Sequence, residues 1–424
     1  MSTIAFPTPI PIIRQHLNNA TFYYKTLYES RYSSLINVNR FNHFNTLLNA
    51  NFDGLYYAKE SGLYEAKSAL LHWKGHEEAF IYTLLFNELD SEKNFEHFWL
   101  MIKELGFNAI IGSLEALIRV EIKSRNKQLA ILKELDPDIF IIALLKIKAH
   151  NMELIHYNEL LYYLNHPSKE IKITLCDYVK KMKITSLSEN IFTLLINSKD
   201  IAVKYAAIDV LCWISNDKEY LYTELSQLIK LYLEDITSKG SQSLIHSKKV
   251  ENLARLMGYT SFINSELAKP PLLCPDYLNI IYYTNSCHAE YIPYLINYLD
   301  DPELSRLAYK GICILTGIDV NSPELTYSSS KQIELAMNNR VRFLSSSVNN
   351  VNLEKVKKTI ISLRLKGKIL LGKPISNHHC EKIIKNGYQL ERHIANWYLC
   401  HSNKEEKYND FCFFNRVKIR NLYD

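Results

Sequence analysis

The stretch from residue 285 to residue 320 constrains the fold most strongly, because it contains two short amphipathic helices separated by a single turn. The turn reads Asp-Asp-Pro at residues 300–302, where an Asp can accept bonds from the free amides of the next helix and Pro is tolerated. Gly317 predicts the end of the second helix. The apolar residues recur at steps of three and four, which places on one helix face Ile292, Leu295, Ile296 and Leu299, and on the other Leu304, Leu307, Ala308, Gly311, Ile312 and Leu315. Neither helix can bury its stripe alone, so the pattern predicts packing against further pairs of this kind.

Two earlier stretches repeat the second stripe with the same spacing. They start at Ile171 and Val203, about one helical-repeat length apart, and Leu304 follows about three such lengths later. The repeated residues are Ile171, Thr174, Leu175, Tyr178, Val179 and Met182, and then Val203, Ala206, Ala207, Val210, Leu211 and Ile214. The sequence therefore predicts an all-α protein, an α-solenoid of stacked antiparallel helix pairs, with its clearest repeats in residues 151–320.

A basic residue lies just inside each second helix, at Lys172, Lys204 and Arg306, and this arrangement resembles the HEAT repeat. Four ordered stretches further resemble a family of bacterial HEAT-repeat proteins of unassigned biochemical role, found near type VI secretion genes. They are residues 51–62 (NFDGLYYAKESG), 291–319, 366–374 (KGKILLGKP) and 387–392 (GYQLER). The chain departs from the family at Cys287 and His288, where the family has Gly-Asp, and near the C-terminus, where only Arg416 and Arg420 echo its Gln-rich ending. The resemblance implies a HEAT-like fold and a role in type VI secretion.

The composition is that of a folded chain with enough apolar material for a core, since 47% of 424 residues are hydrophobic and 22% are charged. A net charge of +5 is too small to predict a dedicated polyanion-binding surface. No apolar run reaches the roughly 18 to 20 residues of a membrane span, and the N-terminus lacks a secretory-signal pattern. The eight cysteines form no Cys-x-x-Cys pair, which favours reduced thiols. We therefore expect a cytoplasmic protein.

The predicted organisation follows the helical pattern and its breaks. We expect an N-terminal arm and helix in residues 1–40, a helical region in 41–150 that is divided at Ser61-Gly62 and at Lys74-Gly75, and the repeats in 151–320. Polar segments predict a linker or long loop in 321–352. Residues 353–424 then predict a helical C-terminal cap, because an open solenoid end would leave an apolar face in water.

The residues that could carry chemistry do not form a recognisable constellation. His76-Glu77-Glu78 resembles one His-Glu pair of helical di-iron hydroxylases, but no second such pair occurs at the repeat period. The nucleotide-binding loop, the serine nucleophile elbow and the zinc-protease helix are also absent from the sequence. The best candidates for a metal site are His378, His379, Cys380, His393, Cys400, His401 and Cys412, whose spacing does not predict convergence. The sequence therefore predicts no metal, no cofactor and no enzyme activity.

Five residues are candidates for contact with a partner. Asp53, followed by Gly54, could present a carboxylate, although an Asp-Gly pair more often caps or kinks a helix. Adjacent tyrosines on a helix cannot both face one core, so one ring of each pair should be exposed and available as a binding anchor. The candidates are Asp53, Tyr162, Tyr163, Tyr282 and Tyr283, and Tyr56-Tyr57 is a further pair of this kind.

Three functions compete at this stage. A non-catalytic protein-binding scaffold, which binds a type VI secretion effector or spike component as adaptor, chaperone or immunity protein, uses the extended surface of a solenoid. A HEAT-like nucleic-acid-binding protein, related in fold to alkylation-repair glycosylases, would be more basic along a groove. An enzyme would need a set of catalytic residues that the sequence does not show. The sequence favours protein binding and leaves the partner and the oligomeric state open.

Overall fold

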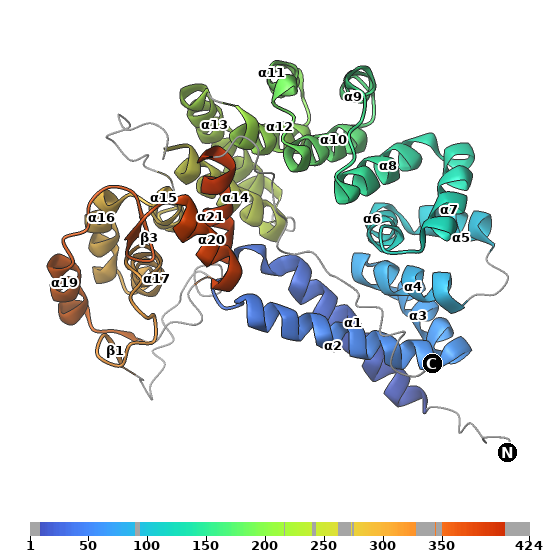
Figure 1. The fold of residues 1–424 in the computed structure, drawn as a ribbon, viewed down its shortest axis with the longest axis horizontal. Helices are drawn as coiled ribbons and strands as arrows, with labels where there is room; N and C mark the ends of the chain where they lie inside the picture. Colours follow the sequence, from blue (N-terminus) through green and yellow to red (C-terminus); the bar gives the residue numbers. More distant parts are fainter. Residues whose placement is uncertain are drawn as a thin grey trace. The chain divides into compact units, whose positions relative to one another are not determined.

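The computed structural model describes residues 9–89, 94–215, 217–239, 243–261, 273, 275–327, 344 and 350–402 (Figure 1). Within these residues the chain is almost entirely helical, with two antiparallel pairs of two-residue strands. The prediction of an all-α protein is therefore confirmed. The described residues form two compact units: unit 1 comprises residues 9–182 and 388–390, and unit 2 comprises residues 183–387 and 391–402.

The helices of unit 1 follow one another through short connections. They are α1 (Ile10–Glu29), α2 (Val38–Tyr57), α3 (Lys59–Trp73), α4 (His76–Leu89), α5 (Phe95–Leu105), α6 (Phe107–Leu117), α7 (Ile122–Leu135), α8 (Pro137–Asn151), α9 (Tyr157–Leu164) and α10 (Lys169–Met182). Helices α4, α6, α8 and α10 pack in succession, α5 contacts both α6 and α7, and α1 lies along α2. The start of α8 shows why one helix ends and the next begins at this position. The Asp136 side chain accepts a hydrogen bond from the Ile139 amide, and Pro137 occupies the first turn, where its missing amide donor is tolerated.

The stretch 51–62 forms the corner between α2 and α3. The predicted break at Ser61-Gly62 is wrong, because α2 ends at Tyr57 and α3 already begins at Lys59. Gly54 lies inside α2, whose C-cap is Ala58; a Cβ at Gly54 would lie 2.8 Å from the His16 ring, so Gly54 lets α1 approach. Gly62 lies inside α3, where a Cβ would lie 2.1 Å from the Leu55 carbonyl oxygen. Gly54 therefore leaves room for the His16 side chain and Gly62 for the Leu55 backbone, where a larger residue would clash.

Unit 2 contains the remaining helices. They are α11 (Ser188–Asn197), α12 (Ile201–Ile214), α13 (Lys218–Lys239), α14 (Ser243–Ser261), α15 (Tyr277–Ser286), α16 (Ile292–Asn297), α17 (Ser305–Thr316), α19 (Leu353–Ser362), α20 (Asn377–Asn386) and, from Glu391 onward, α21 (Gln389–Ser402). Asp200 caps the start of α12, and Asp301 closes the turn of residues 301–304 that precedes α17. The Asp200 carboxylate accepts from the Ala202 and Val203 amides, and the Asp301 carboxylate accepts from the Glu303 and Leu304 amides. The predicted capping role is confirmed for Asp200 at α12, whereas at α17 the N-cap position is Leu304 and Asp301 acts one turn earlier.

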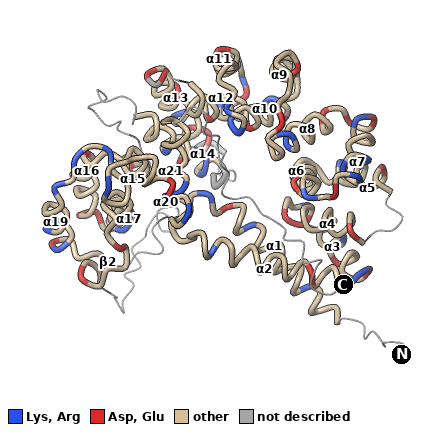
Figure 2. Tube along the Cα trace, viewed as in Figure 1, with Lys and Arg blue, Asp and Glu red and all other residues tan. Residues whose placement is uncertain are grey.

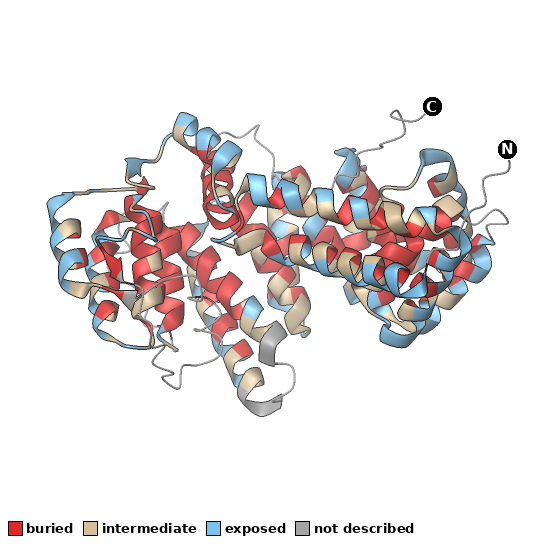
Figure 3. Ribbon diagram, turned by 90° about the horizontal axis from the view of Figure 1, so that it is seen from below, coloured by how far each residue is buried: buried red, intermediate tan, exposed pale blue. Residues whose placement is uncertain are grey.

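The three repeated stripes are buried as predicted, and so is the stripe of the helix at residues 292–299, apart from Ile296, which is only half-buried. Figure 3 shows the buried residues along helix faces inside each unit. Helix α15 differs, because all ten of its residues are buried. A Cβ at Gly258 of α14 would lie 2.7 Å from the Tyr282 carbonyl oxygen, and one at Gly311 of α17 would lie 2.3 Å from Thr284 Oγ1. Helix α15 is therefore enclosed by α14 and α17, which both approach it closely.

The segment 366–374 forms a hairpin of β3 (Ile369–Leu370) and β4 (Lys373–Pro374) that closes the C-terminal end of α17. Its two turn residues, Leu371 and Gly372, have φ of 51° and 75°, as a two-residue hairpin turn with both residues left-handed requires. Their amides donate to the carbonyl oxygens of Ile314 and Leu315 at 2.9 and 2.8 Å. Gly317, with φ 73°, ends α17 as predicted.

Most of the predicted linker, 321–352, lies outside the described residues. Its two ends pair as antiparallel strands β1 (Thr326–Tyr327) and β2 (Asn350–Val351), with Thr326 opposite Val351. Residues 1–8 of the predicted arm and residues 403–424 of the predicted cap, with Cys412, Arg416 and Arg420, also lie outside the described residues.

Candidate functional site

The predicted partner-binding residues of unit 1 lie in different environments. Asp53 is half-buried in α2 and is not without an interaction partner. On α9, Tyr162 is 63% exposed, whereas Tyr163 is buried and its hydroxyl donates to the carboxylate of Glu159. Only Tyr162 of this pair can meet a partner without a rearrangement of the helix.

The expectation that one ring of Tyr282 and Tyr283 is exposed is wrong, because both rings are buried in α15. The rule that adjacent residues cannot face one core fails where a helix has core on every side. Tyr282 and Tyr291 share a hydroxyl–hydroxyl hydrogen bond of 3.2 Å, and Tyr283 stacks on Tyr294 with ring centroids 5.5 Å apart. Burial raises the pKa of both phenols. These tyrosines hold the interior of unit 2 and present no surface to a partner.

The His and Cys residues considered as metal ligands do not converge in unit 2; the histidines contact different partners. His379 Nε2 lies 2.8 Å from the Leu370 carbonyl oxygen, and His401 Nδ1 lies 2.9 Å from the Trp397 carbonyl oxygen. His393 Nδ1 lies 3.0 Å from the Tyr259 hydroxyl. Burial raises the pKa of the Cys380 thiol to about 11. Among the described residues, no group of three or more His, Cys, Asp or Glu side chains could hold a metal ion.

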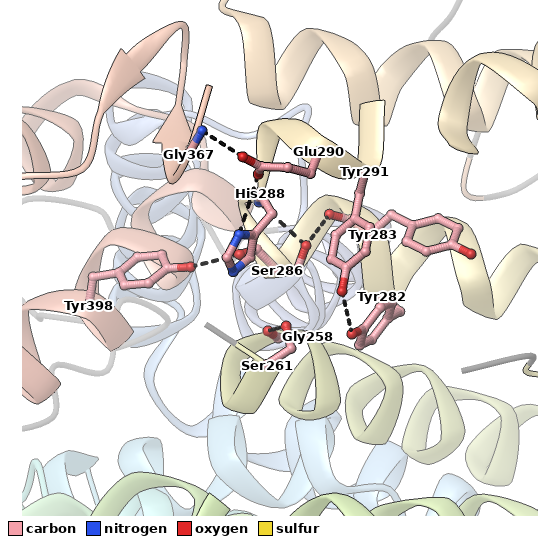
Figure 4. A network of polar contacts seen from close by, with 10 residues as sticks. All are labelled: Gly258, Ser261, Tyr282, Tyr283, Ser286, His288, Glu290, Tyr291, Gly367 and Tyr398. Atoms are coloured by element: carbon pink, nitrogen blue, oxygen red, sulfur yellow. Dashed lines mark hydrogen bonds and ion pairs between the residues drawn. The ribbon is translucent and has the colours of Figure 1, made fainter. Parts of the chain in front are cut away.

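A polar network surrounds the C-terminal end of α15, around Cys287 and His288 (Figure 4). His288 Nδ1 lies 3.6 Å from the Glu290 carboxylate, whose other oxygen accepts from the Gly367 amide at 2.9 Å. Burial, then the charge of Lys368, lowers the pKa of His288. Burial raises the pKa of the Cys287 thiol to about 12, so the thiolate needed for nucleophilic attack is scarce near neutral pH. The network ties residues 287–291 to the segment before β3, as the backbone hydrogen bond from the Ala289 amide to the Gly367 carbonyl oxygen also does.

A second cluster gathers around Glu115 of α6 in unit 1. Glu115 Oε2 accepts from the Tyr24 hydroxyl of α1 at 2.6 Å and lies 3.2 Å from His76 Nε2 of α4, while Oε1 lies 3.5 Å from Lys146 Nζ of α8. Burial acts to raise the pKa of Glu115, but Lys146, His76 and the Tyr24 hydroxyl together hold it well below its usual range. Gly112 makes this geometry possible, since a Cβ there would lie 2.1 Å from the His76 carbonyl oxygen.

The Glu115 cluster was missed by sequence reasoning, which compared His76 with its neighbours Glu77 and Glu78. The actual partner of His76 is 39 residues away, and no local spacing signals it. The cluster joins four helices through one carboxylate whose two oxygens both have partners. It holds α1 against the helices behind it, which is a structural role.

The largest exposed aromatic side chains of unit 1 lie along α3 and at its two ends. Tyr57 is 73% exposed, Tyr64 70% and Trp73 69%, and Leu71 between them is 46% exposed. Tyr64 and Leu71 are seven residues apart and share the helix face away from the buried Ala66 and Leu70. We call Tyr57, Tyr64, Leu71 and Trp73 the α3 surface. The sequence could have indicated this surface, because Tyr64 and Leu71 form an apolar pair at helical spacing on the side of α3 opposite a second apolar stripe.

Comparisons with protein-family models, with curated proteins and with solved structures found no match for this chain. Within the described residues, no helix combines the length and the hydropathy that crossing a bilayer requires.

Proposed function

We propose that the chain is a non-catalytic protein-binding scaffold whose antiparallel helix pairs stack as a HEAT-like α-solenoid. The proposal is supported by the succession of α4, α6, α8 and α10, by the recurring Asp turns, and by buried stripes at a regular spacing. In such an architecture each repeat contacts only its neighbours, which leaves a long continuous surface for a partner.

The α3 surface carries this proposal. Tyr64 and Leu71 share one exposed face of α3, and exposed apolar side chains that lie together mark interaction sites more often than scattered ones do. Tyr and Trp are enriched at binding hot spots, because each buries a large area and loses few rotatable bonds. Tyr162, exposed on α9, is a second and smaller candidate anchor.

The partner class comes from the resemblance of four sequence stretches to a family found near type VI secretion genes. We propose that the partner is a toxic effector or the spike component that carries it, bound in the cytoplasm before export or neutralised there. As an adaptor or chaperone, the chain would be needed for effector delivery, and its deletion would leave the producing cell healthy. As an immunity protein, its deletion would poison the cell unless the effector gene were also removed.

The test is co-purification from cells that express a complete type VI secretion cluster, with the tagged chain as bait. The expected result is recovery of one effector or spike protein, which is lost when Tyr64 and Trp73 are both changed to Ala. Truncation of a hot-spot aromatic costs about 2 kcal/mol or more, which weakens binding by more than tenfold. Ile361→Ala on α19 is the matched control, because Ile361 is 74% exposed but lies in unit 2. Recovery of nucleic acid without any secretion protein would overturn the proposal.

A further inference from the structure

The exposed face of α3 carries charges in an order that complements itself. Glu60 precedes Tyr64 by four residues and Lys67 follows it by three, so these side chains share one helix face with Leu71. Glu60 is exposed and Lys67 is half-buried. The charged positions along the helices are marked in Figure 2. The face therefore has a negative charge on one side of Tyr64 along the helix and a positive charge on the other.

Neither of these two charges is used inside the chain. In the part of the chain that the structure describes, the Glu60 carboxylate and the Lys67 ammonium group make no ion pair and no hydrogen bond. Glu65 of α3 differs, because its carboxylate lies 2.8 Å from Arg14 Nε of α1. The charges of Glu60 and Lys67 are thus available to a second molecule.

The order of the charges selects an antiparallel arrangement of two such helices. Glu60 and Lys67 are seven residues apart, nearly two full turns, so they lie on the same edge of the exposed face. A two-fold axis at Tyr64 places this edge of one copy against the same edge of the other, with Glu60 of each copy beside Lys67 of its partner. The opposite edge carries Ser61 and Ser68, which are exposed and uncharged. A parallel arrangement would place the charged edge against these serines and form no ion pair.

We propose that the exposed face of α3 packs against the same face of a second copy of this chain, as an antiparallel helix pair centred on Tyr64. In this arrangement the two Tyr64 rings, each 70% exposed in the single chain, cover one another. Leu71 then lies towards the end of α2 of the other copy, where Tyr57 is 73% exposed. The pairing covers this face until the secretion partner displaces the second copy, and in this respect the inference rests on the proposed function.

The size of the contact suits a pair that can separate. Helix α3 has 15 residues, which corresponds to a length of about 22 Å. Stable complexes bury about 800 Å² on each partner, which is more than one face of one such helix supplies. We therefore expect a dissociation constant in the micromolar range. In cells that supply the secretion partner, a tighter contact with that partner takes the same surface.

The test is sedimentation velocity of the full chain from about 1 to about 300 µM, in which the unchanged chain should convert from monomer to dimer. Glu60→Lys and Lys67→Glu each turn two attractions into repulsions and should each weaken the dimer about tenfold. The double variant Glu60→Lys/Lys67→Glu restores both pairs with the signs exchanged and should regain the original dissociation constant. Lys127→Glu is the matched control, because Lys127 and Glu134 of α7 are also exposed and seven residues apart, and it should leave the dimer unchanged.

An engineered cysteine tests the register of the pair. Tyr64→Cys places two thiols at the two-fold axis, and mild oxidation should give a disulfide-linked dimer. Leu71→Cys places the two thiols about 20 Å apart, because each lies seven residues from the axis, and should give none. The unchanged chain, whose described cysteines are all buried, provides the baseline.

Three results would overturn the inference: a chain that stays monomeric at about 300 µM, a double charge reversal that dimerises no better than its single variants, or a disulfide at position 71 and none at position 64. The outcome is separable from that of the proposed function. If the secretion partner co-purifies and depends on Tyr64 and Trp73 while the chain is monomeric, this inference fails and the proposed function stands. If the charge reversals act as described but no secretion protein is recovered, the pairing stands and the proposed function fails.

Discussion

The Glu115 cluster predicts a strong energetic coupling between two residues that are 91 positions apart, Tyr24 and Glu115. Tyr24→Phe removes only the hydroxyl that donates to the carboxylate at 2.6 Å, and Glu115→Gln keeps the shape but removes the charge. A hydrogen bond to a charged group contributes about 1.5–3 kcal/mol. The coupling energy from the double-mutant cycle should therefore be about 1.5–2 kcal/mol.

Glu115→Gln alone should destabilise the protein by about 2–3 kcal/mol, because it also weakens the pairs with His76 and Lys146. Their side chains are 16% and 22% exposed, so solvent screens them and they add less than fully buried pairs would. The melting temperature should fall by about 5–10 °C, followed by circular dichroism at 222 nm. Asp300→Asn in the exposed pair with Lys357 is the control and should cost less than about 0.5 kcal/mol.

The same cluster predicts the direction of a pH effect. The folded-state pKa of Glu115 is held below its unfolded value of 4.5, so the unfolded chain takes up this proton first as the pH falls. The stabilisation by Glu115 is therefore complete above the unfolded pKa and is lost progressively as the pH falls from the unfolded pKa towards the lower folded pKa. The stability difference between the unchanged chain and Glu115→Gln should shrink as the pH falls from about 6 to about 3. A coupling energy below about 0.3 kcal/mol, or a difference that grows on acidification, would refute the role given to Glu115.

Three further predictions test the interior and the absence of chemistry. Leu307→Asp should unfold unit 2, because an unpaired buried charge costs several kcal/mol; a soluble variant with an unchanged melting temperature would contradict this. Gly311→Val should lower the melting temperature by more than the exposed change Ile361→Val, since a Cβ at Gly311 meets Thr284 Oγ1 at 2.3 Å. Cys287 should resist alkylation by iodoacetamide at pH 8 in the native protein, because it is buried and its pKa is raised to about 12; rapid labelling seen by mass spectrometry would place it at the surface.

Hydrophobic periodicity predicted which residues are buried in helices whose two faces differ. It failed where packing against distant parts of the chain determines burial. The stripes that begin at Ile171, Val203 and Leu304 are buried, because apolar residues at helical spacing form a face that must pack against other helices. All ten residues of α15 are buried, so both Tyr282 and Tyr283 lie in the core, although one of the two rings was expected to be exposed. The hydrogen bonds of the Asp turns were predictable from sequence, because such a side chain binds amides within three residues of its own position.

The candidate site was less predictable because its parts are distant in sequence. Gly54 and Gly62 look like helix breakers in a single sequence, and only the approach of His16 and of the Leu55 carbonyl group shows why they are glycines. His76 finds its carboxylate on another helix. To predict the α3 surface, one must know which of the two apolar stripes of α3 faces the neighbouring helices. Tyr64 alone does not indicate which stripe is exposed.

The most direct test of protein binding by the α3 surface is site-specific photocrosslinking in cells that carry a complete type VI secretion cluster. A photoreactive phenylalanine derivative would replace Leu71 in one strain and, as the control, Ile361 in another, since both side chains are exposed. The account predicts one dominant protein adduct from position 71, identified by mass spectrometry as an effector or spike component, and no such adduct from position 361. The absence of any protein adduct at position 71, or the same adducts from both positions, would contradict it.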